Sequence, residues 1–201
     1  MQTVLLRWWT AKENYKNYYD FLEKYEIEPY KEKKIKWSDV LQEDLGNNIE
    51  VLEIERPNKD FADYKAWKIM FEKYIPYFKD DIVFVWHSLW WTFILKYLEE
   101  NPDFIEKFKK IILVAPGIDD SEEEVLWTFN VKDNLKNLEK NQNKFIVFAS
   151  KDDFIVNYSE IETLQKYLPN LTYKVFENKG HFLDRKFPEL VEEIKNLIIK
   201  K

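Results

Sequence analysis

One serine, two neighbouring aspartates and one histidine each follow a short apolar run in this chain. Ser88 follows IVFVWH, Asp152 and Asp153 follow FIVFASK, and His181 comes five residues after Phe176, where another apolar run ends. A serine hydroxyl becomes a strong nucleophile when an imidazole takes its proton and a carboxylate orients that imidazole. Each of these residues alone is common in polar loops. Their joint placement after successive apolar runs predicts a nucleophilic site in which either aspartate is a candidate partner of His181.

The elements that must position these residues alternate between strands and helices. Apolar runs predict strands at 3–6, 49–54, 82–86, 110–115, 144–149 and 171–176. Helical spacing predicts helices at 12–27, 38–45, 62–78, 88–98, from Ser159 and from Pro188, the first with an ordinary amphipathic aromatic face. Such alternation predicts an α/β fold, a three-layer α/β/α sandwich with a mostly parallel six-stranded sheet. The carboxyl ends of the strands then meet at one edge, where the candidate residues would gather.

Two of the predicted helix ends have a local signal. Gly46 is a good residue to end the helix at 38–45. Ser159 and Glu162 have the spacing of a capping box, which predicts that Ser159 begins its helix.

Composition narrows the class of protein. The chain has 201 residues, a net charge of -6 and no cysteine, which predicts one domain over 1–201 without disulfides or thiolate metal sites. Basic residues are not clustered, so we expect neither nucleic-acid nor membrane binding. No apolar run approaches the ~18 residues of a membrane span, and the start lacks a signal-peptide pattern. We expect a cytoplasmic monomer or homodimer that acts on a small molecule, with no metal because His87 and His181 lack a third ligand.

Five segments resemble one family. VWHSLWWTFILKYLEE, IILVAPG, FASKDDFIV and KGHF, with ADYKAWKIMFEKYI before them, are similar to segments of small α/β-hydrolases related to retinoblastoma-binding protein 9 and its bacterial homologues. The resemblance extends over about residues 3 to 190. It implies a minimal α/β-hydrolase fold and a serine hydrolase that needs no cofactor.

The resemblance also implies roles for particular residues. Ser88 would be the nucleophile and His181 the base. Asp153 is the better candidate for the acid, because the family places its carboxylate four residues before a loop position that is Asn157 here. The oxyanion would be held by the backbone N–H of Leu89 and by N–H groups near Trp8 and Trp9.

The chain departs from the family pattern on both sides of Ser88. Where the family has G-H-S-L-G-G, this chain reads Trp86-His87-Ser88-Leu89-Trp90-Trp91. Glycine suits these positions because the strand and the following helix pass close together. One extra methylene in a packed core already costs ~1–3 kcal/mol, so we expect the indoles at 86 and 90 to cost far more or to force the turn open.

One substitution would remove all of these departures. Glycine in place of tryptophan at 8, 9, 86, 90, 91 and 127 restores the family pattern, whereas Trp37 and Trp67 suit amphipathic helices as they are. The chain has 3 Gly and 8 Trp, although about 14 Gly are expected at this length. UGA encodes tryptophan in one variant code and glycine in another, and lysine dominates arginine here as in AT-rich genomes. We hypothesise that glycine UGA codons have been translated as tryptophan.

Three functions remain open at this stage. The first is a serine hydrolase of esterase type for an ester, thioester or small amide, with residues 118–143 shaping the acyl pocket. The alternative is a catalytically inactive α/β-hydrolase-fold interaction domain, in which tryptophans fill the site or form an aromatic surface for a partner. A third is related chemistry without net hydrolysis, such as acyl transfer or a cofactor-free haloperoxidase-like reaction.

Overall fold

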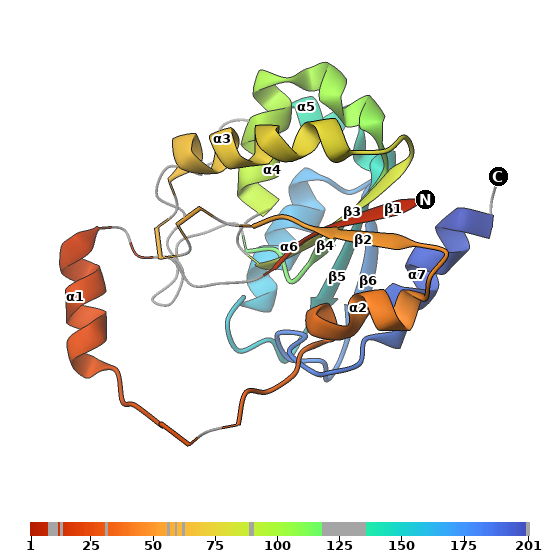
Figure 1. The fold of residues 1–201 in the computed structure, drawn as a ribbon. Helices are drawn as coiled ribbons and strands as arrows, with labels where there is room; N and C mark the ends of the chain where they lie inside the picture. Colours follow the sequence, from red (N-terminus) through yellow and green to blue (C-terminus); the bar gives the residue numbers. More distant parts are fainter. Residues whose placement is uncertain are drawn as a thin grey trace.

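A six-stranded sheet with helices on both faces organises this protein (Figure 1). The computed structural model describes residues 1–7, 12, 14–30, 32–55, 57–58, 60–61, 63–88, 91–117 and 136–199. The strands are β1 (Gln2–Leu6), β2 (Glu50–Glu53), β3 (Ile82–His87), β4 (Phe108–Val114), β5 (Phe145–Ser150) and β6 (Thr172–Phe176). The α-helices are α1 (Tyr15–Lys24), α2 (Trp37–Leu45), α3 (Tyr64–Tyr74), α4 (Trp91–Glu100), α5 (Lys136–Glu139), α6 (Tyr158–Tyr167) and α7 (Pro188–Ile199). Short 3₁₀ turns occur at η1 (Ile75–Tyr77), η3 (Pro102–Lys107) and η5 (Gln142–Lys144).

All strand pairs in the sheet are parallel, in the order β2-β1-β3-β4-β5-β6. The strands lie where the apolar runs predict them, and the three-layer α/β fold is confirmed. β1 lies inside the sheet between β2 and β3, and all five of its residues are buried. Because the strands are parallel, the segments after β3, β5 and β6 emerge at one edge.

Residues of β3 alternate between the two faces of the sheet. Phe84 and Trp86 join the core beneath α3, α4, α5 and α6, whereas Val83 and Val85 join the core beneath α2 and α7. This alternation is the two-residue period of an extended strand. Fully burying a large apolar side chain contributes roughly 1.5–3 kcal/mol, so both cores stabilise the sheet.

The local signals at helix ends are partly confirmed. α2 ends at Gly46, whose φ of 78° is the left-handed backbone that favours glycine. The prediction that Ser159 begins its helix is wrong. Asn157 is the N-cap of α6, and its side chain accepts a hydrogen bond from the Ser159 backbone N–H. Asparagine is at least as good an N-cap as serine, and Asn157 stands two residues before Ser159.

Helix α1 differs from the amphipathic packing that its sequence predicts. None of its residues is buried, and Tyr15 and Tyr19 are 64% and 57% exposed. In Figure 1 it stands apart from the sheet, where Tyr15 and Tyr18 contact Phe61 through their rings. The aromatic residues of α1 recur at helical spacing, but this spacing does not predict which surface of the protein they would pack against.

No helix among the described residues has the length and apolar character needed to cross a bilayer.

Candidate active site

The turn after β3 holds Ser88 in a strained backbone conformation. Its φ is 66°, in the left-handed region that non-glycine residues seldom adopt. Such a conformation costs of order 1–3 kcal/mol and persists where the surroundings impose it. The fully buried strand β3 runs directly into this turn, so the strand fixes where the Ser88 side chain begins. A strained strand-to-helix turn that presents a serine is the geometry of a nucleophile elbow.

Hydrogen bonds connect Ser88, His181 and Asp153 in series. The Ser88 hydroxyl lies 3.0 Å from His181 Nε2, and His181 Nδ1 lies 2.9 Å from Asp153 Oδ2 and 3.0 Å from Oδ1. A carboxylate only accepts, so His181 Nδ1 carries the proton and Nε2 is left to accept from the serine. The side chains of His181 and Asp153 are 0% and 3% exposed, so solvent does not compete for these contacts.

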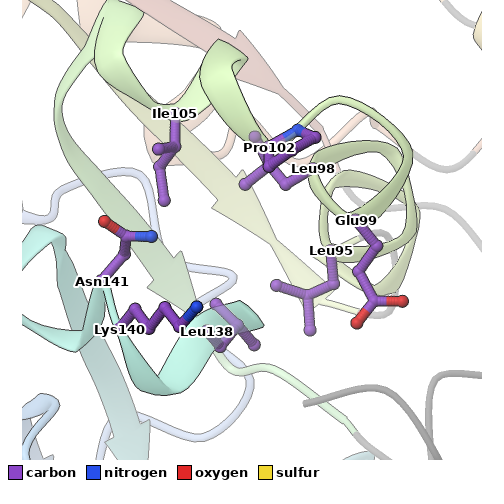
Figure 2. A pocket seen from close by; sticks show the side chains of 8 residues that line it. All are labelled: Leu95, Leu98, Glu99, Pro102, Ile105, Leu138, Lys140 and Asn141. Carbon is purple, nitrogen blue, oxygen red and sulfur yellow. The ribbon is translucent and has the colours of Figure 1, made fainter. Parts of the chain in front are cut away.

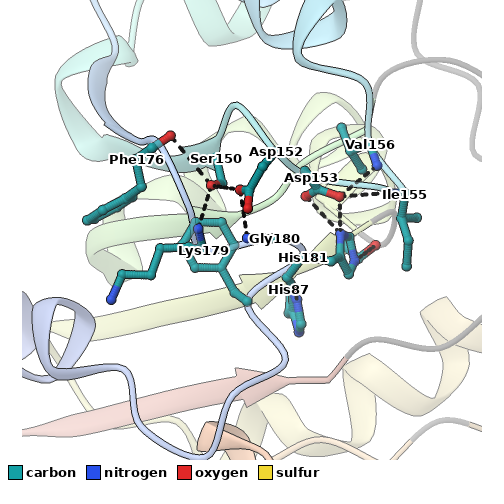
Figure 3. Close-up of polar contacts among 12 residues, drawn as sticks. His87, Ser150, Asp152, Asp153, Ile155, Val156, Phe176, Lys179, Gly180 and His181 are labelled. Atoms are coloured by element: carbon teal, nitrogen blue, oxygen red, sulfur yellow. Dashed lines mark hydrogen bonds and ion pairs between the residues drawn. The ribbon is translucent and has the colours of Figure 1, made fainter.

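The two aspartates after β5 have different partners (Figure 3). Asp153 Oδ1 also accepts from the backbone N–H groups of Ile155 and Val156, at 2.9 and 3.0 Å, which orients its carboxylate toward His181. Asp152 instead accepts from the Ser150 hydroxyl at 2.6 Å and from the Gly180 N–H at 2.8 Å. The structure therefore brings Asp153, and not Asp152, to the imidazole of His181.

Ser150 and Asp152 connect the loops that follow β5 and β6. Ser150 Oγ accepts the Lys179 N–H at 2.9 Å while its hydroxyl donates to Asp152. The hydrogen bonds from Ser150 and Gly180 hold the pKa of the Asp152 carboxyl below its ordinary value. Sequence reasoning missed this connection, although a serine at the end of a buried strand beside an Asp-Asp pair is a usable signal for it.

His87 packs against the loop that carries His181. Its Nε2 lies 3.0 Å from the His181 carbonyl oxygen, and the two imidazole rings stack with centroids 5.1 Å apart. Burial, together with the nearby His181, holds the pKa of the His87 imidazole well below its ordinary value. This hydrogen bond is a further feature that the sequence pattern does not reveal.

Trp86 does not force the turn open, which was one of the two steric outcomes expected from the sequence. Its indole is fully buried and stacks on Phe84 and on Phe93 of α4, with centroids 5.2 and 5.9 Å away. Position 86 faces α3 and α4, on the opposite face of the sheet from position 87, so the indole occupies the core. Trp91 is also buried, and its indole N–H donates to the Gly117 carbonyl.

Several predicted features lie outside the described residues. These are the oxyanion residues Leu89, Trp8 and Trp9, the tryptophans Trp90 and Trp127, and the 118–135 part of the expected acyl pocket. Among the described residues, no three His, Asp or Glu side chains lie close enough together to hold a metal ion.

A cavity of about 120 Å³ lies between α4, η3 and α5, away from the serine (Figure 2). Leu95, Leu98, Ile105 and Leu138 supply much of its apolar lining, and Glu99 is at its edge. Ser88, Asp153 and His181 do not line it. These lining residues lie toward the end of α4 and just before β4 and β5, which places the cavity near the opposite edge of the sheet.

Comparison with known proteins places this geometry in a family. The model of a family described as "Serine hydrolase" matches residues 30–196, which include Ser88, Asp153 and His181. The chain belongs to the serine hydrolase family. It is therefore a member of a hydrolase family, in agreement with the coarse prediction from the sequence. A search of curated proteins found no match.

Solved structures confirm the minimal α/β-hydrolase fold. The ydeN gene product of B. subtilis aligns with a TM-score of 0.66 at 17% identity, over 99% of each chain. Est1E from Butyrivibrio proteoclasticus, solved with ferulic acid bound, has a TM-score of 0.60 at 13% identity, over 99% of this chain and 88% of that one. A putative yden-like hydrolase from Pectobacterium atrosepticum has a TM-score of 0.57 at 11% identity, over 98% and 91%. At these identities the likeness concerns the fold.

Proposed function

We propose that this serine hydrolase family member is an esterase-type enzyme that cleaves a small acyl ester, thioester or amide through an acyl-enzyme. The observation that carries the proposal is the hydrogen-bonded series Ser88–His181–Asp153, at 3.0 and 2.9 Å, on a serine with φ of 66°. Ester hydrolysis releases a carboxylic acid, and Est1E, which shares this fold, was solved with such an acid, ferulic acid, bound.

The proposed reaction begins at Ser88. His181 Nε2 takes the hydroxyl proton as Ser88 Oγ bonds to the acyl carbon, and the carbonyl oxygen becomes an oxyanion. His181 then gives that proton to the leaving oxygen, sulfur or nitrogen as its bond to the acyl carbon breaks. Water repeats the sequence on the acyl-enzyme and releases the acid. Asp153 keeps the His181 proton on Nδ1 and stabilises the imidazolium that forms transiently.

Backbone N–H groups hold the oxyanion in the proposed reaction. The N–H of Leu89 is the first donor, and an N–H near Trp8 or Trp9 is the second. Loss of one such donor typically costs about 10²–10³ in kcat.

We also propose that the chain is one domain, acts as a monomer or homodimer in the cytoplasm, and is related to the retinoblastoma-binding protein 9 group.

We further propose that the native protein has glycine at 8, 9, 86, 90, 91 and 127. What supports this is the shared family pattern and the glycine deficit. The indole N–H of Trp86 adds to it, because it is buried with no acceptor among the described residues. An unsatisfied buried donor costs about 1–3 kcal/mol, which glycine would not incur. UGG codons at 86 and 90 in the gene would refute this proposal.

The test of function is covalent labelling with a fluorophosphonate probe. The printed chain and the six-glycine version would be labelled in parallel, each beside a Ser88→Ala variant and a Ser159→Ala control at the surface start of α6. We expect peptide mass spectrometry to find the label on Ser88, lost in Ser88→Ala and kept in Ser159→Ala. The glycine version should label faster, because glycine at 8, 9 and 90 would let the oxyanion-binding backbone approach the substrate closely.

The other outcomes discriminate between the proposals. Equal labelling of both versions would support the hydrolase function and would show that the tryptophans do not impair the active site. No labelling of either folded version would overturn the hydrolase and favour the inactive interaction domain. Against that alternative, the described tryptophans 37, 67, 86 and 91 are all buried and form no exposed aromatic surface. If Ser88 labels, product analysis with an added acyl acceptor would separate hydrolysis from acyl transfer.

A further inference from the structure

His87 lies beside the nucleophile in sequence and against the base in space. It is the last residue of β3, so its backbone is continuous with that of Ser88. Its imidazole is 2% exposed and stacks on the ring of His181, with an interplanar angle of 28°. A single side chain therefore connects the segment that carries the nucleophile with the segment that carries the base.

The hydrogen bond between His87 and His181 has a defined direction. The His181 carbonyl oxygen only accepts, so His87 Nε2 carries the proton and donates across 3.0 Å. Burial keeps His87 neutral, since it depresses the pKa of this imidazole. A neutral His87 places no second positive charge beside His181 when that residue becomes an imidazolium.

The backbone that His87 holds is strained. Gly180 and Phe182, on either side of His181, have φ of 51° and 52°, and Phe182 pays a steric cost there because it has a Cβ. Strained segments keep their conformation when contacts impose it from outside. Hydrogen bonds from outside reach this segment. His87 donates to the His181 carbonyl, and Trp37 Nε1–H donates to the Phe182 carbonyl at 2.8 Å. The carboxylate of Asp152 accepts from the Gly180 N–H.

We propose that His87 is a positioning residue, which holds the His181 backbone through its Nε2–H and thereby fixes His181 Nε2 at hydrogen-bonding distance from Ser88 Oγ. This inference rests on the proposed function and deepens it. Of the contacts named above, the hydrogen bond from His87 is the one that originates next to the nucleophile. Its loss should therefore change the position of the base relative to the nucleophile most directly.

Two variants of similar shape separate the hydrogen bond from packing. Glutamine places an amide N–H at the same number of bonds from Cα as His87 Nε2, and methionine fills a similar volume without a donor. In whichever version labels at Ser88, we expect H87M to lower the fluorophosphonate labelling rate by on the order of 10–100-fold, since a misplacement of 1 Å can cost 10²-fold. H87Q should keep most of the rate. Trp37→Phe, which removes the neighbouring donor, is the matched control and should slow labelling less than H87M.

A second readout does not depend on activity. The chain contains only two histidines, so ¹⁵N-histidine labelling reports these two imidazoles alone. In the printed chain we expect His87 to be protonated on Nε2 and His181 on Nδ1, with the His181 N–H protected from exchange. H87M should expose that N–H to rapid exchange, and H87Q should restore its protection.

The outcomes distinguish this inference from the proposed function. Absence of Ser88 labelling overturns the function, while the nitrogen spectra still decide whether His87 holds His181. A proton on His87 Nδ1, or a His181 N–H as protected in H87M as in the parent, overturns the inference. So does labelling of H87M at the parental rate, or an equal loss in H87Q and H87M, which would mean that packing alone matters.

Discussion

At the scale of single residues, Asp153 and its neighbour Asp152 differ in their hydrogen-bond partners. Asp153 faces the imidazole of His181, and Asp152 faces the hydroxyl of Ser150 and a backbone N–H. The two residues are adjacent and chemically identical, so sequence alone separates them only through the family resemblance.

This difference predicts unequal effects of the same substitution. Asp153→Asn should lower kcat by about 10⁴, because an amide cannot keep the His181 proton on Nδ1. Asp152→Asn should cost far less, since it leaves the imidazole contact in place and weakens only the hydrogen bonds from Ser150 and Gly180. Steady-state kinetics on an ester substrate, or fluorophosphonate labelling rates, would measure both. Equal losses in the two variants would contradict the assignment of Asp153.

At the scale of elements, α1 and the segment after it have the weakest attachment among the described elements. α1 contains no buried residue, and residues 21–30 and 32–35 are all exposed. In Figure 1 this part of the chain runs well away from the sheet before it returns at α2. Exposed connections with little packing are the preferred sites of proteolytic cleavage.

Limited trypsin digestion should therefore cut this connection first. The expected sites follow Lys24, Lys33 or Lys34, all exposed, whereas lysines of the strands are protected by the sheet. Because β1 is held between β2 and β3, the cut chain should keep its far-ultraviolet circular dichroism and most of its thermal stability. Mass spectrometry of the first fragments would check this. An initial cut within β4 or β5 would show that the core opens more readily than the connection.

At the scale of the whole molecule, stability depends on pH through a buried imidazole. The pKa of His87 is lowered well below 6.5 in the folded chain by burial and by His181, while the unfolded chain binds a proton near 6.5. Below that pH the unfolded state holds one more proton than the folded state, so stability falls as pH falls and is restored above it. Each pH unit below 6.5 should remove about 1.4 kcal/mol from the free energy of unfolding, until the folded-state pKa is reached.

Urea unfolding of the parent and of H87Q would isolate this contribution. Other groups titrate in both chains, so the difference between the two pH profiles reports His87. We expect the parent to lose stability more steeply than H87Q between about pH 7 and about pH 5.5. Parallel profiles would show that His87 does not become protonated on unfolding, or that it is charged in the folded chain.

How much of this molecule follows from sequence depends on the interaction concerned. The six strands were predictable because apolar runs bounded by polar turns have few other arrangements, and the serine, aspartate and histidine followed from the strand ends. The burial of the Trp86 side chain was not predictable. A family pattern with glycine at this position does not indicate that a side chain at 86 would point into the core beneath α3 and α4. The bonds from His87 and Ser150 to the last loop join positions that are distant in sequence and share no local pattern.

The position of β1 between β2 and β3 determines when this strand can complete its pairing during synthesis. Its Thr3 pairs with Val51 on one side and with Val83 on the other. During synthesis β1 can pair with β2 first, but its other edge stays unpaired until β3 has emerged from the ribosome. Long-range parallel pairing is slow and leaves such edges open to association. The growing chain is therefore most in need of protection by chaperones between the appearance of its first strand and that of the nucleophile turn.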